Sequence, residues 1–541
     1  MTHTAHPTPS TMIARAAVSV ALVTVAARVV GLIRMVVLAA TVGDSGFLGN
    51  TYASANLLPN VVFEVVAGGA LASLVVPVLA GPVERGDEQT TARAASGLLT
   101  RTVVVLVPAA LVGLILARPL MSLLTAGVTD DVTREAQVDL GARMLVVFMP
   151  QVVLYGVGIV LAGLLQSHRK FVAAALAPLL SSLVVIVTYL LYAQGAGSGL
   201  PGEVSRRDEL VLSVGTTLGV VVLSLSLLWP ASRLGISLRP VWRLPDGIGA
   251  RVRRLAIAGA AGVIAQQVAL LAATIVANEQ SGAVIGYQLS YAVFLLPWGV
   301  LAVPLATSAF PTLAANADAD RLGVYSSTLA GASRAMVVVC AGASAILWAV
   351  HRPLARLLPF APDAVGDVVG REAVGDGVKL FVLGLVPYGL LALLTRALFA
   401  RGRTAAAGSA MVIGFAVTAV GCFVGAAVSS ADPVSVIGLA HSAGMLVAAV
   451  LLVVGVIRDT GRRSLAGTAR STLVAVPSAA LAAWIGTVVV GQLDLGSRSS
   501  LLVACAVGAA VVSVTFAALL TAARDPALAA VAGQLRRTRR D

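Results

Sequence analysis

The sequence predicts an all-α integral membrane protein with about fourteen transmembrane helices, arranged as two parallel six-helix repeats and two extra C-terminal helices. Composition is the first observation behind this prediction, because the 541 residues are 58% hydrophobic and only 12% charged. Soluble cores do not need so much apolar sequence, whereas membrane spans of about twenty residues do. Such spans begin near residues 13, 47, 96, 138, 171, 208, 253, 283, 325, 377, 404, 433, 470 and 499.

Internal repetition is the second observation. The segment Asn50–Pro59 reappears loosely as Gln288–Pro297, with the two prolines 238 positions apart. Pro150 and Pro387 belong to a second matching pair of segments, at a spacing of 237. Two nearly equal spacings indicate duplication of a unit of roughly 240 residues. Each copy contains six spans, so both copies enter the membrane from the same side and the repeats are parallel.

The duplication divides the chain into lobes and connecting segments. We expect a cavity between the two lobes, because proline and glycine breaks in paired helices expose backbone only around a cavity. The last two spans have no counterpart within the repeat. The predicted parts are a polar N-terminal tail (1–12), an N-terminal six-helix lobe (13–234), a basic cytoplasmic linker (235–252), a C-terminal six-helix lobe (253–469), two extra helices (470–523) and a basic cytoplasmic tail (524–541).

The distribution of basic residues predicts the orientation. Alternate loops and the C-terminal tail carry about 22 basic residues, against about eight on the opposite side, so the basic side should face the cytoplasm. An even number of spans then places both termini inside. This topology accounts for the net charge of +13. Because the arginines form no folded basic module, no nucleic-acid partner is expected.

The three cysteines predict neither a disulfide framework nor a metal site. Cys340, Cys422 and Cys505 lie in separate apolar spans, far apart in the sequence. In such places a cysteine acts as a small hydrophobic residue.

Charged residues inside the predicted spans are the candidate functional residues. Arg28 lies near the middle of the first span, and Arg34 is six residues further on. An arginine at mid-bilayer costs about 2.5–3.5 kcal/mol on insertion scales, so such residues usually face protein or water. We interpret both as ligands in a cavity, with Gly31 allowing a bend between them. The structural alternative is that Arg34 extends to the outer interface and Arg28 pairs with Glu64.

Four more residues complete the candidate substrate-binding set. Glu64, in the broken second span, is the natural counter-ion for Arg28, although a carboxylate there could equally be a proton or cation site. In the second repeat the position equivalent to Arg28 is Gln266. The cavity should therefore be more cationic on the side of the N-terminal lobe. Asn60 follows the first repeated proline, and Gln288 begins the second repeated segment.

Three other polar residues in the spans have simpler interpretations. Arg143 lies in the first turns of the fourth span, where it would line an outer vestibule. Arg396 lies near the inner end of the tenth span, where its long side chain can reach the interface. His441 is isolated in the twelfth span and is interpreted as a packing histidine rather than a pH sensor.

The sequence carries no motif for catalysis. It contains no Gly-x-x-x-x-Gly-Lys-Ser/Thr loop, no His-Glu-x-x-His motif and no Ser/His/Asp arrangement in a soluble domain. We therefore expect a protein that is not an enzyme, uses no cofactor and does no ATP chemistry itself. Transport would draw on the membrane potential, an ion gradient or consumption of the cargo outside.

These residues resemble a known family. The stretch Ala27–Arg34 is similar to the Ser-Arg-x-x-Gly-x-x-Arg-Asp signature in the first helix of the MurJ/MviN lipid II flippases. Leu58–Asn60, with Ala67–Ala70 and Val75–Leu79, resembles the family's second-helix pattern of Pro-Asn, Glu-Gly-Ala and Phe-Val-Pro. The stretch from Leu296 to Leu313 is similar to its eighth helix. The resemblance covers the full length and lies within the multidrug/oligosaccharidyl-lipid/polysaccharide exporter superfamily.

The chain departs from the family pattern at several positions, as a divergent branch would. Ala27 and Met35 replace the family's Ser and Asp around the two arginines. Phe63 and Glu64 stand where a basic pair is usual after Pro-Asn, and Ala292 stands where the eighth helix usually has an arginine. This sequence thus keeps two of the family's cavity arginines, as Arg28 and Arg34, and lacks others. The missing arginines imply either an altered cargo or loss of transport.

The resemblance implies a flippase that moves lipid-linked peptidoglycan precursor (lipid II) from the inner to the outer leaflet by alternating access. The implied cargo is a lipid-linked diphosphate of the undecaprenyl type, whose tail would lie in an apolar groove of the last two helices. The implied location is the bacterial cytoplasmic membrane. The implied partners are membrane lipids, to which cell-wall synthesis proteins can be added. Two alternatives remain: an ion-coupled exporter of drugs or another lipid-linked oligosaccharide, and a transport-inactive scaffold for cell-wall enzymes.

Overall fold

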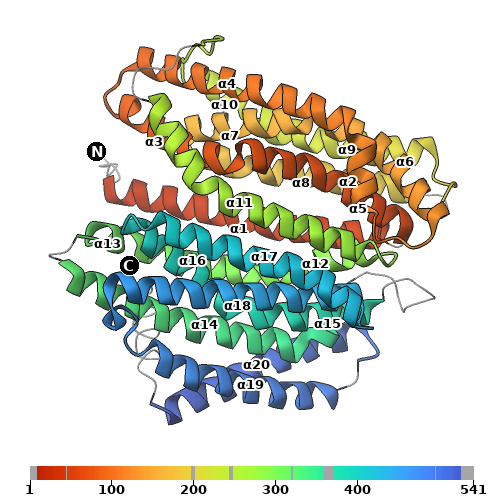
Figure 1. Cartoon of the computed structure of the whole chain (residues 1–541), viewed down its shortest axis with the longest axis vertical. Coiled ribbons are helices and arrows are strands. Elements are labelled where there is room, and N and C mark those ends of the chain that lie inside the picture. Colours follow the sequence, from red (N-terminus) through yellow and green to blue (C-terminus); the bar gives the residue numbers. More distant parts are fainter. Residues whose placement is uncertain are drawn as a thin grey trace, which may run out of the picture. The chain divides into compact units, whose positions relative to one another are not determined.

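The structure is a computed structural model that describes residues 9–43, 46–195, 201–242, 248–318, 321–358, 370–493 and 495–524. Side chains are described for all of these except 9–22, 24–25, 67–74 and 248–260. The greater part of the predicted N-terminal and C-terminal tails, and residues 243–247 of the predicted linker, lie outside the described residues. The described part is built from α-helices, as predicted (Figure 1).

The chain divides into two compact units, Met1–Val263 and Ile264–Asp541. The division falls inside one long helix, α11 (Ile248–Ala277), whose first five residues were predicted as linker and the rest as the start of the second lobe. The lobe boundaries given above therefore stay predictions. Each unit is described by itself.

The first unit contains ten helices besides the first part of α11, counted over its described residues, and one π-helical segment, η1. They are α1 (Pro9–Thr41), α2 (Gly46–Phe63), η1 (Glu64–Gly68), α3 (Gly69–Glu84), α4 (Glu88–Ile115), α5 (Ala117–Leu124), α6 (Asp131–Phe148), α7 (Gln151–Ser167), α8 (Phe171–Ala193), α9 (Arg206–Leu225) and α10 (Leu228–Ser232).

The second unit continues from α11 in the same manner. Its segments are α12 (Ala283–Pro297), η2 (Trp298–Ala302, π-helical), α13 (Val303–Ala315), α14 (Leu322–Leu357), α15 (Arg371–Phe381), η4 (Val382–Gly384, 3-10), α16 (Leu385–Ala400), α17 (Thr404–Val428), α18 (Pro433–Thr460), η5 (Arg462–Leu465, 3-10), α19 (Thr468–Gly491) and α20 (Arg498–Ala522).

Three pairs of helices pack in the same way in both units. In the first unit α2 packs against α6, α4 against α7, and α8 against α9. In the second unit α12 packs against α15, α14 against α16, and α17 against α18. Each of these pairs occupies the matching place in its copy of the repeat. This agreement is what parallel duplication requires.

The helix breaks predicted from the repeated prolines occur in both units. Pro59 lies in α2 just before the π-helical η1, and Pro297 ends α12 directly before the π-helical η2. The second pair also matches, because a turn at Met149 and Pro150 separates α6 from α7 while η4 separates α15 from α16. Proline produces these breaks because it lacks the amide hydrogen and clashes with the preceding turn.

The extra C-terminal helices belong to the second unit. Both α19 and α20 pack against α14 and against each other, and Figure 1 draws them side by side beside it. Their shared core is made of small and branched residues, among them Ala349, Ala482 and Val512. Such residues allow close helix packing, which replaces the hydrophobic driving force that is missing in lipid.

The length and hydropathy of the helices fit a multi-pass membrane protein. Over the described residues, eleven helical stretches are long and apolar enough to cross a membrane, and two shorter apolar stretches are Val75–Glu84 and Ala261–Ala277. The count of about fourteen spans stays a prediction.

Side chains at the water-facing ends begin several helices. The Asp87 carboxylate accepts a hydrogen bond from the Thr90 amide at 2.9 Å and caps α4, and hydrogen bonding from Thr90 lowers the pKa of Asp87. Asp130 caps α6 in the same way through the Thr133 amide at 2.8 Å. These caps satisfy amide groups that a helix leaves unpaired at its start.

A close glycine contact between α17 and α18 yields a first prediction. A Cβ atom at Gly414 would lie 2.8 Å from the Gly444 carbonyl oxygen and 2.6 Å from the Ala448 Cβ. We expect Gly414→Ala to destabilise the protein by about 1–3 kcal/mol, because backbone must move to admit the methyl group. Gly408→Ala in the same helix is the control, since nothing lies within 4 Å of its Cβ position. Thermal unfolding of both variants in detergent would reveal the difference, and equal melting temperatures would contradict the packing.

Candidate functional site

Arg28 and Arg34 lie on α1 of the first unit, which packs along α8. The side chain of Arg28 is exposed, and that of Arg34 is half-buried. The charge of Arg34 lies in the neighbourhood of the side chains of Tyr52, Tyr155 and Tyr189. Arg34 therefore faces a polar region inside the unit, while Arg28 remains accessible.

The tyrosines around Arg34 form a network that the sequence analysis missed. The Tyr52 hydroxyl is 2.9 Å from the Tyr189 hydroxyl and 2.7 Å from the Thr216 hydroxyl, and all three side chains are buried. Helices α2, α8 and α9 meet there. One signal was available, because Tyr52 lies within the repeated segment that ends at Pro59.

Glu64 is the first residue of η1, and its side chain is half-buried. Among the side chains that the structure describes, no ion pair joins Glu64 to Arg28. The expected counter-ion pair is therefore absent from this conformation. Both charges stay available to a ligand or to another state of the protein.

The accessible face of the broken second span is defined by Asn60 and Glu64. Asn60 is exposed and lies four residues before Glu64, so the two share one side of the segment. Phe63, by contrast, is buried, with its ring centroid 5.7 Å from that of Tyr155. Of the two positions where the family usually has a basic pair, only that of Glu64 is accessible.

The second unit contributes amides in place of arginines. Gln266 lies on α11 and is half-buried, and its neighbour Gln267 is buried. Gln288 lies on α12 between the buried residues Tyr287 and Leu289, and is itself half-buried. The expected difference in charge between the two sides of a cavity stays a prediction, as does the participation of these amides in a shared cavity.

An apolar groove runs along the second unit, and we call it the tail groove. It has a volume of about 610 Å³ and lies between α14, α16 and α19. Its lining includes Trp348, Val386, Val476, Ala480 and Trp484. A cavity of this size and character suits an extended hydrocarbon chain.

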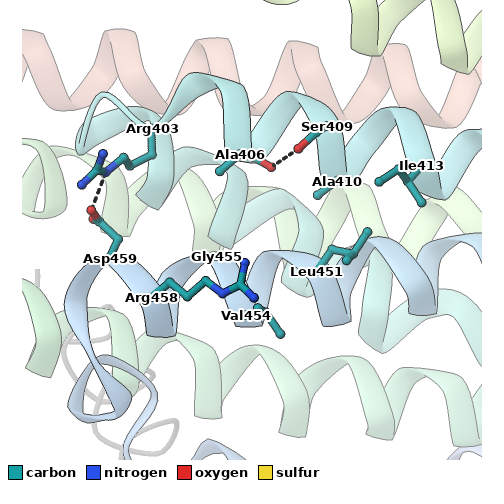
Figure 2. Close-up of a pocket in the computed structure, with 10 residues that line it drawn as sticks. All are labelled: Arg403, Ala406, Ser409, Ala410, Ile413, Leu451, Val454, Gly455, Arg458 and Asp459. Atoms are coloured by element: carbon teal, nitrogen blue, oxygen red, sulfur yellow. Dashed lines mark hydrogen bonds and ion pairs between the residues drawn. The ribbon is translucent and has the colours of Figure 1, made fainter.

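A smaller cavity of about 360 Å³ lies between α17 and α18 of the second unit. Figure 2 shows Arg403 pointing toward Asp459, with Arg458 beside them and Ile413 and Leu451 further along the cavity. Asp459 also accepts a hydrogen bond from Arg401 Nε at 2.9 Å. The carboxylate thus links two arginines at the helix ends, which indicates a structural role.

Arg143 and Arg396 have structural partners. The Nε of Arg143 donates to Glu209 Oε2 at 3.0 Å, and Arg206 pairs with the other oxygen of this buried carboxylate. Arg143 therefore connects α6 to α9. This structural contact was not part of the sequence interpretation, which placed Arg143 only in the lining of an outer vestibule. Arg396 donates a 2.7 Å hydrogen bond to the Ala392 carbonyl one turn earlier.

His441 packs among aromatic rings, as expected for a packing histidine. Its ring centroid lies 5.4–5.6 Å from those of Tyr291, Phe294, Phe381 and Tyr388. Cys340 and Cys422 are buried, Cys505 is half-buried, and all three are free thiols. Over the described residues, no group of three or more His, Cys, Asp or Glu residues could hold a metal ion.

The repeated helix packing, the paired breaks and the polar residues on broken helices define a membrane transporter with internal duplication. Solved structures of that class share the fold. One described as lipid II flippase MurJ in an inward closed conformation aligns with a TM-score of 0.72 at 16% identity, covering 93% of this chain and 98% of that one. An inward-facing multidrug resistance MATE family transporter of the MOP superfamily aligns at 0.63 and 14% identity, covering 82% and 96%.

Sequence comparison places the chain within this class. The family profile described as lipid II flippase MurJ matches residues 38–504. A relative from Rhizobium meliloti, named probable lipid II flippase MurJ, is 25% identical over 396 residues, or 70% of this chain and 69% of the relative. A relative of the same name from Haemophilus influenzae is 25% identical over 299 residues, or 54% and 56%. The chain belongs to the MurJ family, as its motifs predict, and is accordingly a multi-pass protein of the bacterial inner membrane.

Proposed function

We propose that the protein flips lipid II, the lipid-linked peptidoglycan precursor, from the inner to the outer leaflet by alternating access. One observation in the structure supports this proposal in addition to membership of the family. The chain combines an accessible arginine inside an apolar helix, Arg28, with a long apolar groove. Together these features suit a cargo that has an anionic head and a hydrocarbon tail. A purely apolar or cationic cargo would not need Arg28.

The chemistry of the two features fits a polyprenyl diphosphate. The arginine fork donates two hydrogen bonds to phosphate oxygens and stays charged in a dehydrated site. Amides such as Asn60, Gln266 and Gln288 can hydrogen-bond the sugar and peptide parts of the head. An undecaprenyl-type tail would stay in the membrane and occupy the tail groove, so only the head would have to cross. The two lobes would rock about the midplane to move it.

Rescue of a bacterium depleted of its own lipid II flippase tests the proposal. Expression of this chain should restore growth and normal cell shape, and should restore accessibility of lipid II at the outer leaflet. An empty vector and a MATE-type exporter at equal expression serve as controls. No rescue, together with raised resistance to cationic drugs, would favour the drug-exporter alternative instead.

The orientation gives a second prediction. The basic residues Arg251–Arg254, at the start of α11, and the tail at Arg536–Arg540 should both be cytoplasmic, because the basic residues concentrate on one side of the chain. Reporter enzymes fused after each segment would be active only on the corresponding side of the membrane. An external C-terminus would show that the number of spans is odd and that the division into six, six and two is wrong.

A further inference from the structure

A third cavity of the second unit lies where α14 ends. It has a volume of about 590 Å³, within the range of roughly 300–1,000 Å³ that is typical of small-ligand sites. Its charged lining comprises four arginines and two carboxylates: Arg352, Arg356, Arg371, Arg498, Glu372 and Asp376. We call it the arginine pocket. Four positive against two negative charges leave a formal excess of +2, which favours an anion.

A buried histidine in the lining lacks a partner. His351 is only 4% exposed, and its Nδ1 lies 2.6 Å from the Trp348 carbonyl oxygen, to which it donates. Its Nε2 is buried, and no described group forms a hydrogen bond with it. An unpaired buried polar atom is costly, and buried polar atoms normally have a partner. Because Nδ1 carries the ring proton, Nε2 is an acceptor that a phosphate oxygen cannot partner, so the preference of the pocket for an anion rests on its arginines.

Most of the arginines in the pocket are not neutralised by the protein. The ion pairs between described side chains include Arg118, Arg143 and Arg401, but not Arg352, Arg356 or Arg498. The side chains of these last three are also exposed. Their guanidinium groups therefore remain free to bind phosphate oxygens in bidentate fashion.

The arginine pocket lies further along α14 than the tail groove, and the two cavities share no lining residue. Trp348 of α14 lines the groove, and His351 and Arg352 line the pocket, about one helical turn of 5.4 Å further on. Thr487 of α19 also lines the groove, while Arg498 at the start of α20 lines the pocket. A molecule with a hydrocarbon chain in the groove would thus place an anionic head group in the pocket.

We infer that the arginine pocket is an exit site, which holds the diphosphate of the lipid-linked cargo after its head group has crossed the membrane. In the proposed orientation, this end of α14 faces the outside. The inference rests on the proposed function, because the same amphiphile must first be flipped. The site is separate from Arg28 and Arg34, which lie in the other unit.

Binding of a soluble analogue to the purified full-length protein tests the inference. The probe is farnesyl diphosphate, with inorganic diphosphate as the tail-free comparison, measured by calorimetry in an Arg28→Ala background that removes the first site. Arg352→Gln and Arg498→Gln should each weaken farnesyl diphosphate binding about tenfold, since hydrogen bonds to charged groups are the strong ones. Arg134→Gln, on α6 of the first unit, is the matched control and should leave binding unchanged.

A variant of the tail groove tests whether one ligand occupies both the groove and the arginine pocket. Ala480 is an exposed residue of the groove lining, so Ala480→Trp should fill the groove without disturbing the core. It should reduce the affinity for farnesyl diphosphate to that for inorganic diphosphate, which itself should not change. Melting temperature and gel-filtration profile confirm that each variant is folded.

Three results would overturn the exit site. The first is unchanged binding in the Arg352→Gln and Arg498→Gln variants. The second is equal affinity of the Arg28→Ala protein for farnesyl and inorganic diphosphate, which would indicate a site for free anions. The third is equally effective competition by phosphatidylglycerol vesicles, which would indicate a site for ordinary lipid phosphates. Failure of the proposed function is detected separately, by absence of growth rescue with the unmodified chain.

Discussion

Replacing Arg28 with alanine is expected to abolish rescue of a flippase-depleted host while leaving the amount of protein in the membrane near normal. Arg28 is exposed, lies inside an apolar helix and forms no ion pair with a described side chain. Two lost hydrogen bonds to a diphosphate, at about 1.5–3 kcal/mol each, would lower affinity on the order of a hundredfold or more. The protein should still insert, because alanine is easier to bury than a charge.

Two variants sharpen this expectation. Arg28→Lys should restore only part of the activity, because a point charge lacks the bidentate fork. Arg118→Ala should leave activity unchanged, since Arg118 is an exposed residue paired with Glu135 and Asp139 and such pairs contribute little. Full activity of the Arg28→Ala variant would reduce Arg28 to a structural residue.

Replacing Glu64 with glutamine is expected to tighten precursor binding and slow turnover. Glu64 shares the accessible face of the second span with Asn60, and no described side chain neutralises it by an ion pair. We propose that its carboxylate pairs with Arg28 in one access state and is displaced by the diphosphate in another. A competing charge of this kind favours release of cargo, and its removal shifts the balance toward the bound state.

Measurements at two membrane potentials separate this idea from ion coupling. If Glu64 is a proton or cation site, Glu64→Gln should lose dependence on the ion and gain no affinity for the precursor. Glu135→Gln, at an exposed ion pair on α6, serves as the control for loss of one carboxylate. Unchanged binding and unchanged transport in Glu64→Gln would exclude both roles.

The architecture was predictable because it depends on local features of the sequence. The cost of exposing polar backbone to lipid makes long apolar stretches helical whatever their neighbours. Proline acts on its own turn, so Pro59 and Pro297 predicted where the helices break. The spacing of these breaks also predicted that the two halves share a packing scheme.

The partners of individual side chains were not predictable, because they depend on which helices meet. Arg143 pairs with Glu209, 66 positions later in the chain. Tyr52 bonds to Tyr189 and Thr216 across 137 and 164 positions. Nothing in the local sequence around Arg143 or Tyr52 specifies these contacts. The resemblance to the family also showed that Phe63 and Glu64 replace a basic pair. Only the structure shows that the Phe63 ring is buried while the Glu64 carboxylate is accessible.

The π-helical segments have a mechanical consequence. A π turn closes its hydrogen bond one residue later than an α turn, so it stores one extra residue in the helix. If η1 converts to α-helix, the parts before and after it must turn relative to each other by about 100° and shift by about 1.5 Å, the step of one α-helical residue. Glu64 is the first residue of η1, so the direction in which its side chain points depends on whether this segment is π-helical or α-helical. The π-helical segment η2 holds the same extra residue, so its conversion to α-helix would rotate and shift the flanking parts of the second unit by the same amounts. The duplication has therefore produced one possible hinge in each unit.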